Sequence, residues 1–150
     1  MRLDSPHFTR GESLPKRFTA AGENLSPSLT FHEPPAGAGS FALLCEDPDA
    51  PGKTWTHWIL FNLPASAAAL PEGLARRQYP LPGVSQGLND FGGLGYAGPL
   101  PPPGQKHRYI FRLYAVSGVL KLAPGIEKTA LLRALDGKTL GQAELTVHYP

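Results

Sequence analysis

Five polar side chains stand where apolar segments of this 150-residue sequence begin or end. Asp47 and Asp49 follow one apolar run, His57 enters the next, and His107 and Tyr109 open a third. An imidazole can donate a hydrogen bond to an anion, and a nearby carboxylate can fix its tautomer and support its positive charge. These residue types predict a small anion site, most naturally one for phosphate.

A stiff loop between two apolar runs carries the two carboxylates. It reads Glu-Asp-Pro-Asp-Ala-Pro-Gly from Glu46 to Gly52. Proline fixes its own φ and keeps the preceding residue out of the helical region, so we expect Asp47 and Ala50 to be extended. Because this tight run must reverse the chain, the Ala50–Pro51 peptide is a candidate cis bond, although only about 5–6% of X–Pro bonds are cis.

Other chemistries fit the sequence less well. Two histidines and two aspartates can bind a metal, but here they lie far apart, without an HExxH motif or a cysteine–histidine pairing. Cys45 ends an apolar run and is interpreted as a buried core thiol. The Gly-x-Ser-x-Gly pattern at 83–87 lacks the preceding strand and following helix of a nucleophile elbow. We therefore assign no metal ligand, no cofactor and no catalytic residue.

Residues 71–106 form the longest stretch without hydrophobic periodicity, and they are rich in glycine and proline. A long loop of this kind is usually either functional or disordered, and its aromatic residues Phe91 and Tyr96 favour an ordered loop. Backbone N–H groups of the glycine-rich segment Gly95–Gly98 could form a nest around the same anion.

Strands dominate the regions that must position these residues. Apolar or alternating segments predict strands at 29–31, 40–46, 55–63, 107–116 and 143–149. Strict alternation would place His57 on the same strand face as Trp55, Ile59 and Phe61. An amphipathic helix is predicted at 126–135, and residues 64–70 could form one helical turn. The pattern favours a mainly β fold, an antiparallel β-sandwich with one or two short helices.

Length and composition limit the function classes. The chain is expected to form one domain over residues 1–150. Its net charge of +2 comes without clustered basic residues, which argues against nucleic-acid binding. The single cysteine cannot form an internal disulfide, and neither a signal peptide nor a membrane-spanning run is visible. We therefore expect a cytoplasmic protein with no stable membrane insertion.

The chain resembles the phosphatidylethanolamine-binding protein family, most closely its bacterial branch, which is often described as Raf-kinase-inhibitor-like. The motifs that carry this resemblance run in family order along nearly the whole chain: Gly22-Glu23-Asn24-Leu25-Ser26-Pro27, Asp47-Pro48-Asp49-Ala50-Pro51, His57-Trp58, Asn89-Asp90-Phe91-Gly92, Gly98-Pro99 and His107-Arg108-Tyr109. The Asp-Pro-Asp-Ala-Pro and Gly-Pro…His-Arg-Tyr motifs are quite specific together. The resemblance implies a large antiparallel sheet packed on a smaller one, with a pocket for phosphate, phosphorylated head groups or similar anions.

The resemblance also implies roles for individual residues and partners. By motif, the residues that carry over into the pocket are Asp47, His57, His107 and Tyr109. Those that carry over as shaping it are Asp49, Pro51, Gly98 and Pro99. The family includes modulators of kinases and proteases, and its bacterial members resemble homodimers, so a protein partner and a homodimer are both expected.

Taken together, the sequence predicts a non-enzymatic, anion-binding β-sandwich that acts on a protein partner through its pocket. One alternative is a regulatory inhibitor with a vestigial pocket, and another is a hydrolase that uses the histidines and aspartates. Animal relatives continue past the last strand into a helix beside the pocket, whereas this sequence ends at Pro150. We therefore expect an open pocket with few apolar walls, which binds free anions with a Kd on the order of 0.1–1 mM.

Overall fold

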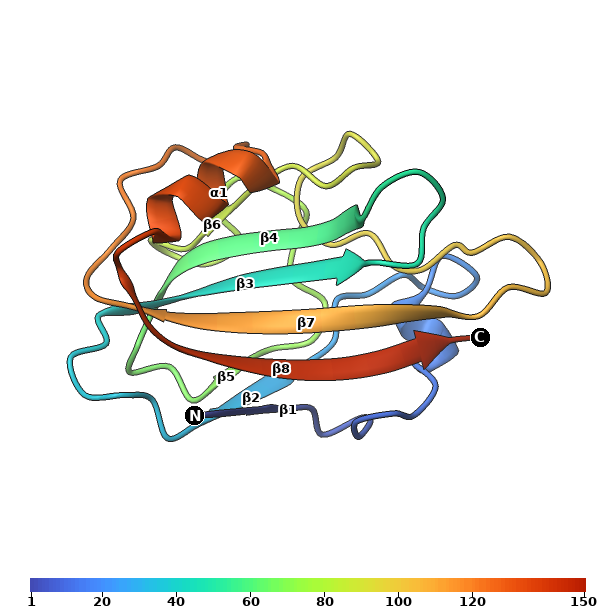
Figure 1. The fold of residues 1–150 in the computed structure, drawn as a ribbon, viewed down its shortest axis with the longest axis horizontal. Coiled ribbons are helices and arrows are strands. Elements are labelled where there is room, and N and C mark those ends of the chain that lie inside the picture. Colours follow the sequence, from blue (N-terminus) through green and yellow to red (C-terminus); the bar gives the residue numbers. More distant parts are fainter.

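Two antiparallel sheets pack face to face in the computed structural model, which describes residues 1–150 (Figure 1). The strands of the large sheet are β3 (Ser40–Asp47), β4 (Trp55–Pro64), β6 (Ser85–Gln86), β7 (His107–Val116) and β8 (Thr139–Tyr149). Those of the small sheet are β1 (Arg2–Asp4), β2 (Leu29–His32) and β5 (Ala69–Leu70). The orders are β6-β4-β3-β7-β8 and β1-β2-β5. The predicted sandwich of a large sheet on a smaller one is confirmed.

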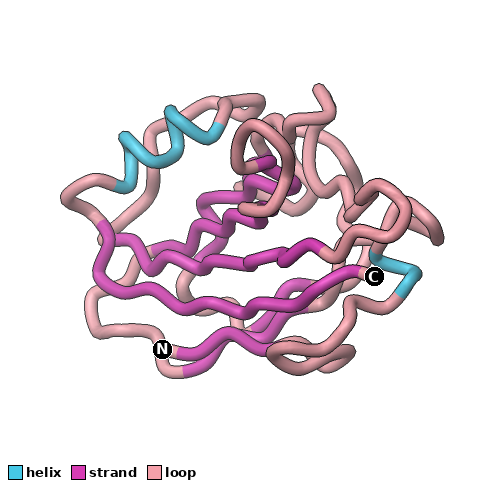
Figure 2. The backbone as a smooth tube through the Cα atoms, turned by 45° about the vertical axis from the view of Figure 1, so that its right-hand side comes forward, coloured by secondary structure: helices cyan, strands magenta, loops and turns pink.

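The large sheet separates two apolar cores. On its inner face, Trp58 and Phe111 pack toward the small sheet, and a short 3-10 helix, η1 (Lys16–Phe18), adds the buried ring of Phe18. On its outer face lies the helix α1 (Lys128–Leu135), as Figure 2 shows, and Leu131 of this helix packs in one cluster with Ile59. Every residue of the central strand β3 is buried, as its continuous apolar sequence predicts for a strand covered on both faces.

The predicted strands and helix are present, with shifted ends. The last strand begins at Thr139 instead of residue 143, and the helix begins at Lys128 instead of residue 126. The helical turn expected at 64–70 is absent, because Ala69 and the buried Leu70 pair with β2 instead. Strand pairing and burial therefore override the helix propensity of this alanine-rich segment. The strands β1, β5 and β6 were not predicted, since two or three residues give no readable alternation.

One end of the large sheet carries the loops that hold most of the predicted site residues. The ends of β3 and β8 and the beginnings of β4 and β7 lie there, and the loops at 48–54 and 98–106 project beyond them (Figure 1). The chain therefore brings Asp47, His57 and His107 to the same edge, although they are far apart in the sequence. None of the helices is both long and apolar enough to span a bilayer.

Candidate functional site

The loops at this end of the sheet enclose a pocket of about 280 Å³. Its lining residues are Asp47, Ala50, Pro51, Trp55, His57, Phe91, Leu100, Pro101, Pro102, His107 and Tyr109. Five of the predicted site residues are therefore brought together here: Asp47, Pro51, His57, His107 and Tyr109. The predicted convergence of residues from separate strands is confirmed.

A β-bulge in β4 aims the His57 ring into this pocket. Cys45 pairs with Trp58 and the next residue, Glu46, pairs with Thr56, so His57 is the extra residue of β4. A bulge of this kind locally breaks the alternation of side chains and redirects one of them. The expected grouping of His57 with Ile59 and Phe61 is therefore wrong, whereas Trp55 lines the pocket together with His57, as expected.

The His57 imidazole is held by a backbone carbonyl and by two aromatic rings. Its Nδ1 donates a hydrogen bond to the Ala97 carbonyl at 2.5 Å. Its ring lies edge-on to Tyr109 and Phe91, with centroids 5.3 and 5.4 Å away. Burial lowers the pKa of His57, although the bond to Ala97 opposes this shift, so the neutral ring is favoured. The other nitrogen, Nε2, makes no hydrogen bond within the chain.

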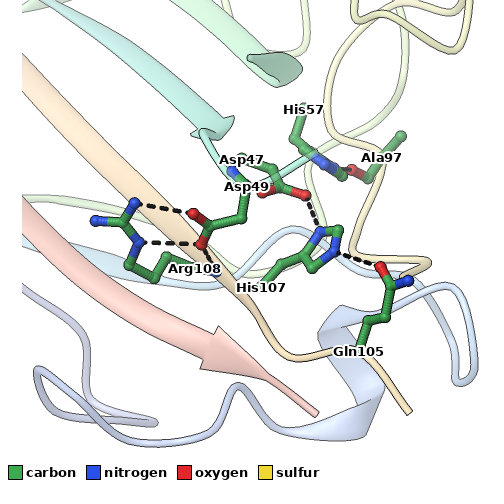
Figure 3. Close-up of polar contacts among 7 residues, drawn as sticks. All are labelled: Asp47, Asp49, His57, Ala97, Gln105, His107 and Arg108. Atoms are coloured by element: carbon green, nitrogen blue, oxygen red, sulfur yellow. Dashed lines mark hydrogen bonds and ion pairs between the residues drawn. The ribbon is translucent and has the colours of Figure 1, made fainter. Parts of the chain in front are cut away.

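The second histidine, His107, lies between two oxygen atoms (Figure 3). Its Nδ1 is 2.6 Å from Oδ2 of Asp47, and both of these side chains are buried. Its Nε2 is 3.2 Å from Oε1 of Gln105. The other oxygen of Asp47 accepts the Asp49 N–H at 2.8 Å. Asp47 therefore fixes both the imidazole ring and the beginning of the proline loop.

Tyr109 supplies a neutral hydroxyl to the pocket wall. The side chain is almost fully buried, yet its hydroxyl makes no hydrogen bond within the chain. Burial, and then the negative charge of Asp47, raise the pKa of Tyr109 far above its usual value. The hydroxyl therefore stays protonated and can donate a hydrogen bond at any physiological pH.

The predicted site residue Asp49 points away from the pocket and holds its loop to β7. Its carboxylate accepts hydrogen bonds from the backbone N–H, Nε and Nη2 of Arg108 at 2.8, 3.0 and 2.9 Å (Figure 3). These hydrogen bonds lower the pKa of Asp49 to about 2. Asp49 therefore lies outside the lining and holds the proline loop to β7.

The expected cis bond at Ala50–Pro51 is wrong, because this peptide is trans. Gly52 adopts a φ of +83° and turns the chain at this point. Glycine takes this conformation without steric cost, so the reversal needs no cis proline.

Gly98 and Pro99 also lie outside the lining and anchor a wall of the pocket. The Gly98 N–H donates to Oδ1 of Asn24 at 2.7 Å, and the Pro99 carbonyl accepts from Ala20 at 3.0 Å. A Cβ on Gly98 would lie 2.3 Å from the Phe18 carbonyl oxygen, so only glycine fits. Asn24 is therefore a supporting residue, although the sequence showed it only as part of a motif.

The predicted N–H nest at Gly95–Gly98 is wrong. The N–H groups of Gly95, Ala97 and Gly98 donate to Gly87, His57 and Asn24, respectively. Three of the four amides of the segment are thus bonded within the protein. The bond from Ala97 to His57 instead helps to hold the bulge that presents the imidazole.

Apolar walls surround the polar floor, contrary to expectation. Trp55 and Phe91 pack edge to face at 5.6 Å on one side, and Leu100, Pro101 and Pro102 form another. Phe91 and Leu100 are 49% and 66% exposed. The walls come from the first residue of β4 and from the long connection between β6 and β7.

Two residues with side chains that can act as nucleophiles, Cys45 and Ser85, are both buried. Cys45 is buried in the inner core, and burial raises the pKa of its thiol. Ser85 is buried in β6 opposite Phe61, so it is not on a nucleophile elbow. No group of three or more histidine, cysteine or acidic side chains is arranged to hold a metal ion.

Comparison with known proteins identifies the family. The model of the family described as "Phosphatidylethanolamine-binding protein" matches residues 4–150. This chain belongs to that family. A UPF0098 protein of Methanothermobacter thermautotrophicus is 47% identical over 145 residues, which cover 97% of this chain and 95% of that relative. The UPF0098 protein YbhB of Escherichia coli is 43% identical over 123 residues, covering 77% of this chain and 78% of YbhB.

Solved structures of phosphatidylethanolamine-binding protein relatives share the fold. A putative homolog from Chlamydia trachomatis superposes with a TM-score of 0.90 at 39% identity, covering 99% of this chain and 96% of that one. Escherichia coli YbcL, described as a member of the mammalian family, superposes with a TM-score of 0.90 at 34% identity and the same coverage. The family indicated by the sequence motifs is therefore confirmed.

Proposed function

We propose that the pocket binds a small oxyanion, such as phosphate or a phosphorylated head group, without converting it chemically. The observation that carries this proposal is a pair of unengaged polar atoms on the pocket wall, Nε2 of His57 and the hydroxyl of Tyr109. The buried His107–Asp47 pair lies beside them. An imidazolium N–H and a phenol hydroxyl are both donors that the oxygens of an anion accept.

The state of His57 sets the pH dependence of this binding. Because burial lowers its pKa, His57 is neutral near pH 7 before an anion binds. An anion favours the cationic ring, so binding takes up a proton at Nε2. Affinity is therefore expected to rise as the pH falls from neutrality toward the lowered pKa of His57.

Binding without turnover is proposed because no activated nucleophile accompanies the histidines. Neither His57 nor His107 is hydrogen-bonded to a serine, threonine or cysteine side chain. The one thiol, Cys45, is buried away from the pocket lining. The Tyr109 hydroxyl is held protonated, so it can donate a hydrogen bond but cannot attack.

The apolar walls favour an anion that carries an organic group. Trp55, Phe91 and Leu100 can cover such a group, at a gain of about 25 cal/mol for each Å² of apolar surface removed from water. Inorganic phosphate gains nothing from these walls, so we retain a Kd on the order of 0.1–1 mM for it. A phosphomonoester with an apolar substituent is expected to bind more tightly.

A protein partner is the second part of the proposal. A phosphorylated segment of a kinase or protease would offer both the anion and the apolar neighbour that the pocket accommodates. In that case free phosphate and the partner compete for the same site. A partner that binds independently of phosphate would instead favour an inhibitor with a vestigial pocket.

Calorimetric titration of the protein with phosphate, phosphoethanolamine and phenyl phosphate tests the binding proposal. We expect saturable binding of one equivalent, which is weaker for inorganic phosphate than for phenyl phosphate. The absence of saturable binding for all three would reject it. A phosphatase and esterase screen on the same sample tests the absence of turnover, since product that disappears in His57→Ala would indicate a hydrolase.

A further inference from the structure

Both ring nitrogens of His107 are engaged within the chain, whereas Nε2 of His57 is free. In His107, Asp47 takes Nδ1 and Gln105 takes Nε2. The Asp47 contact is short and buried, but the Gln105 contact is 3.2 Å long and its side chain is exposed. A hydrogen bond at the long end of the usual range is weak. Gln105 is therefore the partner of His107 that a ligand can replace.

Gln105 belongs to a loop that makes few other hydrogen bonds. We call residues Leu100–Lys106 the pocket loop; it follows the anchored Pro99 and ends just before His107, the first residue of β7. Its backbone makes one hydrogen bond, from the Gln105 N–H to the Pro102 carbonyl within the loop. The contact between Gln105 and His107 is the single side-chain hydrogen bond that joins the pocket loop to the rest of the protein.

The same loop forms a wall of the pocket. Leu100, Pro101 and Pro102 line it, and the exposed Leu100 side chain stands at its mouth. Gly104, which precedes Gln105, has a φ of +78°, and a Cβ added there would meet no atom within 4 Å. The wall and the Gln105 side chain thus belong to one segment that makes few hydrogen bonds to the rest of the protein. Loss of the contact between Gln105 and His107 therefore also releases the wall.

The amide of Gln105 suits such an exchange chemically. An amide offers a carbonyl acceptor and an NH₂ donor, so Gln105 can satisfy Nε2 of His107 in either protonation state by turning over. An anion can only accept a hydrogen bond from an N–H group, and a charge-assisted bond of this kind is stronger than a bond to a neutral amide. An anion in the pocket can therefore displace the amide from His107.

We propose that Gln105 is an internal competitor that occupies His107 in the empty protein and is displaced by the ligand. The displacement couples anion binding to the release of the pocket loop. Gln105 is thus an affinity-determining residue that does not itself need to touch the ligand. This inference rests on the proposed anion binding at the same pocket.

The test compares three variants with the wild-type protein by phosphate titration. Gln105→Ala removes the competitor and is expected to bind phosphate about two- to tenfold more tightly. Gln105→Glu places a carboxylate that holds His107 and repels the anion. The affinity for phosphate is therefore expected to fall by up to about tenfold. Gln142→Ala is the matched control, because Gln142 is an exposed glutamine of β8 whose side chain makes no hydrogen bond. Its affinity should equal that of the wild-type protein.

A second measurement works without any ligand. Amide hydrogen exchange at residue 105, whose N–H makes the one backbone hydrogen bond of the pocket loop, is expected to be faster, relative to its intrinsic rate, in ligand-free Gln105→Ala than in the wild-type protein or Gln142→Ala. Phosphate should speed exchange at this amide in the wild-type protein and leave Gln105→Ala unchanged. Equal affinities of wild-type and Gln105→Ala proteins, or phosphate that slows exchange in the loop, would overturn the inference while leaving anion binding intact. Loss of phosphate binding in every protein would reject the proposed function, and unaltered exchange in Gln105→Ala would then reject the role of Gln105 as well.

Discussion

Glu46 and Asp47 are consecutive residues of β3 whose buried carboxylates serve opposite faces of the large sheet. Asp47 binds His107 on the pocket side. Glu46 is bound by Arg112 of β7 and by Lys128 at the start of α1 on the outer side. Successive strand residues point to opposite faces. Asp47 therefore connects β3 to the pocket, and Glu46 connects it to the helix.

This division predicts different outcomes for two conservative substitutions. Asp47→Asn removes the charge from a buried hydrogen bond and should lower the free energy of unfolding by about 1.5–3 kcal/mol. It should also weaken phosphate binding, because His107 loses its orienting partner. Glu46→Gln should lower the free energy of unfolding by a similar amount and leave phosphate affinity unchanged. Urea unfolding and calorimetry check both, and a loss of affinity in Glu46→Gln would contradict the separation of the two faces.

Removal of the unengaged donors should weaken binding while the fold is kept. His57→Ala should lower phosphate affinity about tenfold or more, since a hydrogen bond to a charged group contributes about 1.5–3 kcal/mol. Tyr109→Phe removes one hydroxyl and should lower affinity about two- to tenfold. The matched control is His32→Ala, because His32 lies outside the pocket on β2. Wild-type affinity in His57→Ala, with a native circular dichroism spectrum, would count against this assignment.

The burial of His57 should make the free energy of unfolding depend on pH. Its folded-state pKa lies below the usual 6.5, so the unfolded chain takes up a proton first as the pH falls. The contribution of His57 to stability is therefore full above pH 6.5, and it declines between that value and the lower folded-state pKa. His57→Gln should flatten this decline in urea unfolding between pH 7.5 and 5.5. A decline of equal size in the variant would assign the effect to other groups.

Anion affinity should move in the opposite direction over the same pH range. Sulfate is the suitable probe, because its charge is constant there and only the protein titrates. We expect sulfate to bind more tightly at pH 5.5 than at pH 8, since the cationic form of His57 favours the anion. Binding that strengthens at pH 8 would contradict a role for imidazolium.

The apolar walls should discriminate between ligands. Phe91→Ala and Leu100→Ala are expected to weaken phenyl phosphate binding by about fivefold each, if each covers roughly 40 Å² of the ligand ring at about 25 cal/mol per Å². Their affinity for inorganic phosphate should be unchanged. Parallel calorimetric titrations measure both values, and equal losses for the two ligands would show that these side chains act on the polar floor instead.

The anchor of the pocket loop should tolerate no side chain. Gly98→Ala forces a Cβ against the Phe18 carbonyl and should cost about 1–3 kcal/mol of unfolding free energy. Gly93→Ala is the control, because the nearest atom to its added Cβ lies at an ordinary 3.7 Å. Thermal unfolding of both variants tests the difference, and equal midpoints would contradict the close approach at Gly98.

Much of the site was predictable because its residues stand beside local signals. Asp47, His57 and His107 flank clear apolar strands, and prolines mark the rigid loop between two of them. Antiparallel neighbours return to the same end of a sheet, so their convergence followed from strand order and motif.

The remaining features depend on contacts that local sequence does not carry. The bulge at His57 arises from the register between β3 and β4, and alternation alone placed the ring on the wrong face. The positive φ of Gly52 made a cis bond at Pro51 unnecessary. The amides of Gly95 and Gly98 are used by distant partners, and Gln105 matters only through its contact with His107. Each of these outcomes was decided by tertiary pairing.

The most direct test is a phosphate titration followed by NMR at the side chains of all five histidines. The proposed binding predicts saturable shifts at the imidazoles of His57 and His107, with one common Kd on the order of 0.1–1 mM. The other three histidines, His7, His32 and His148, lie outside the pocket and should shift little. Equal non-saturable shifts at all five, or saturation confined to the three histidines outside the pocket, would contradict anion binding at this site.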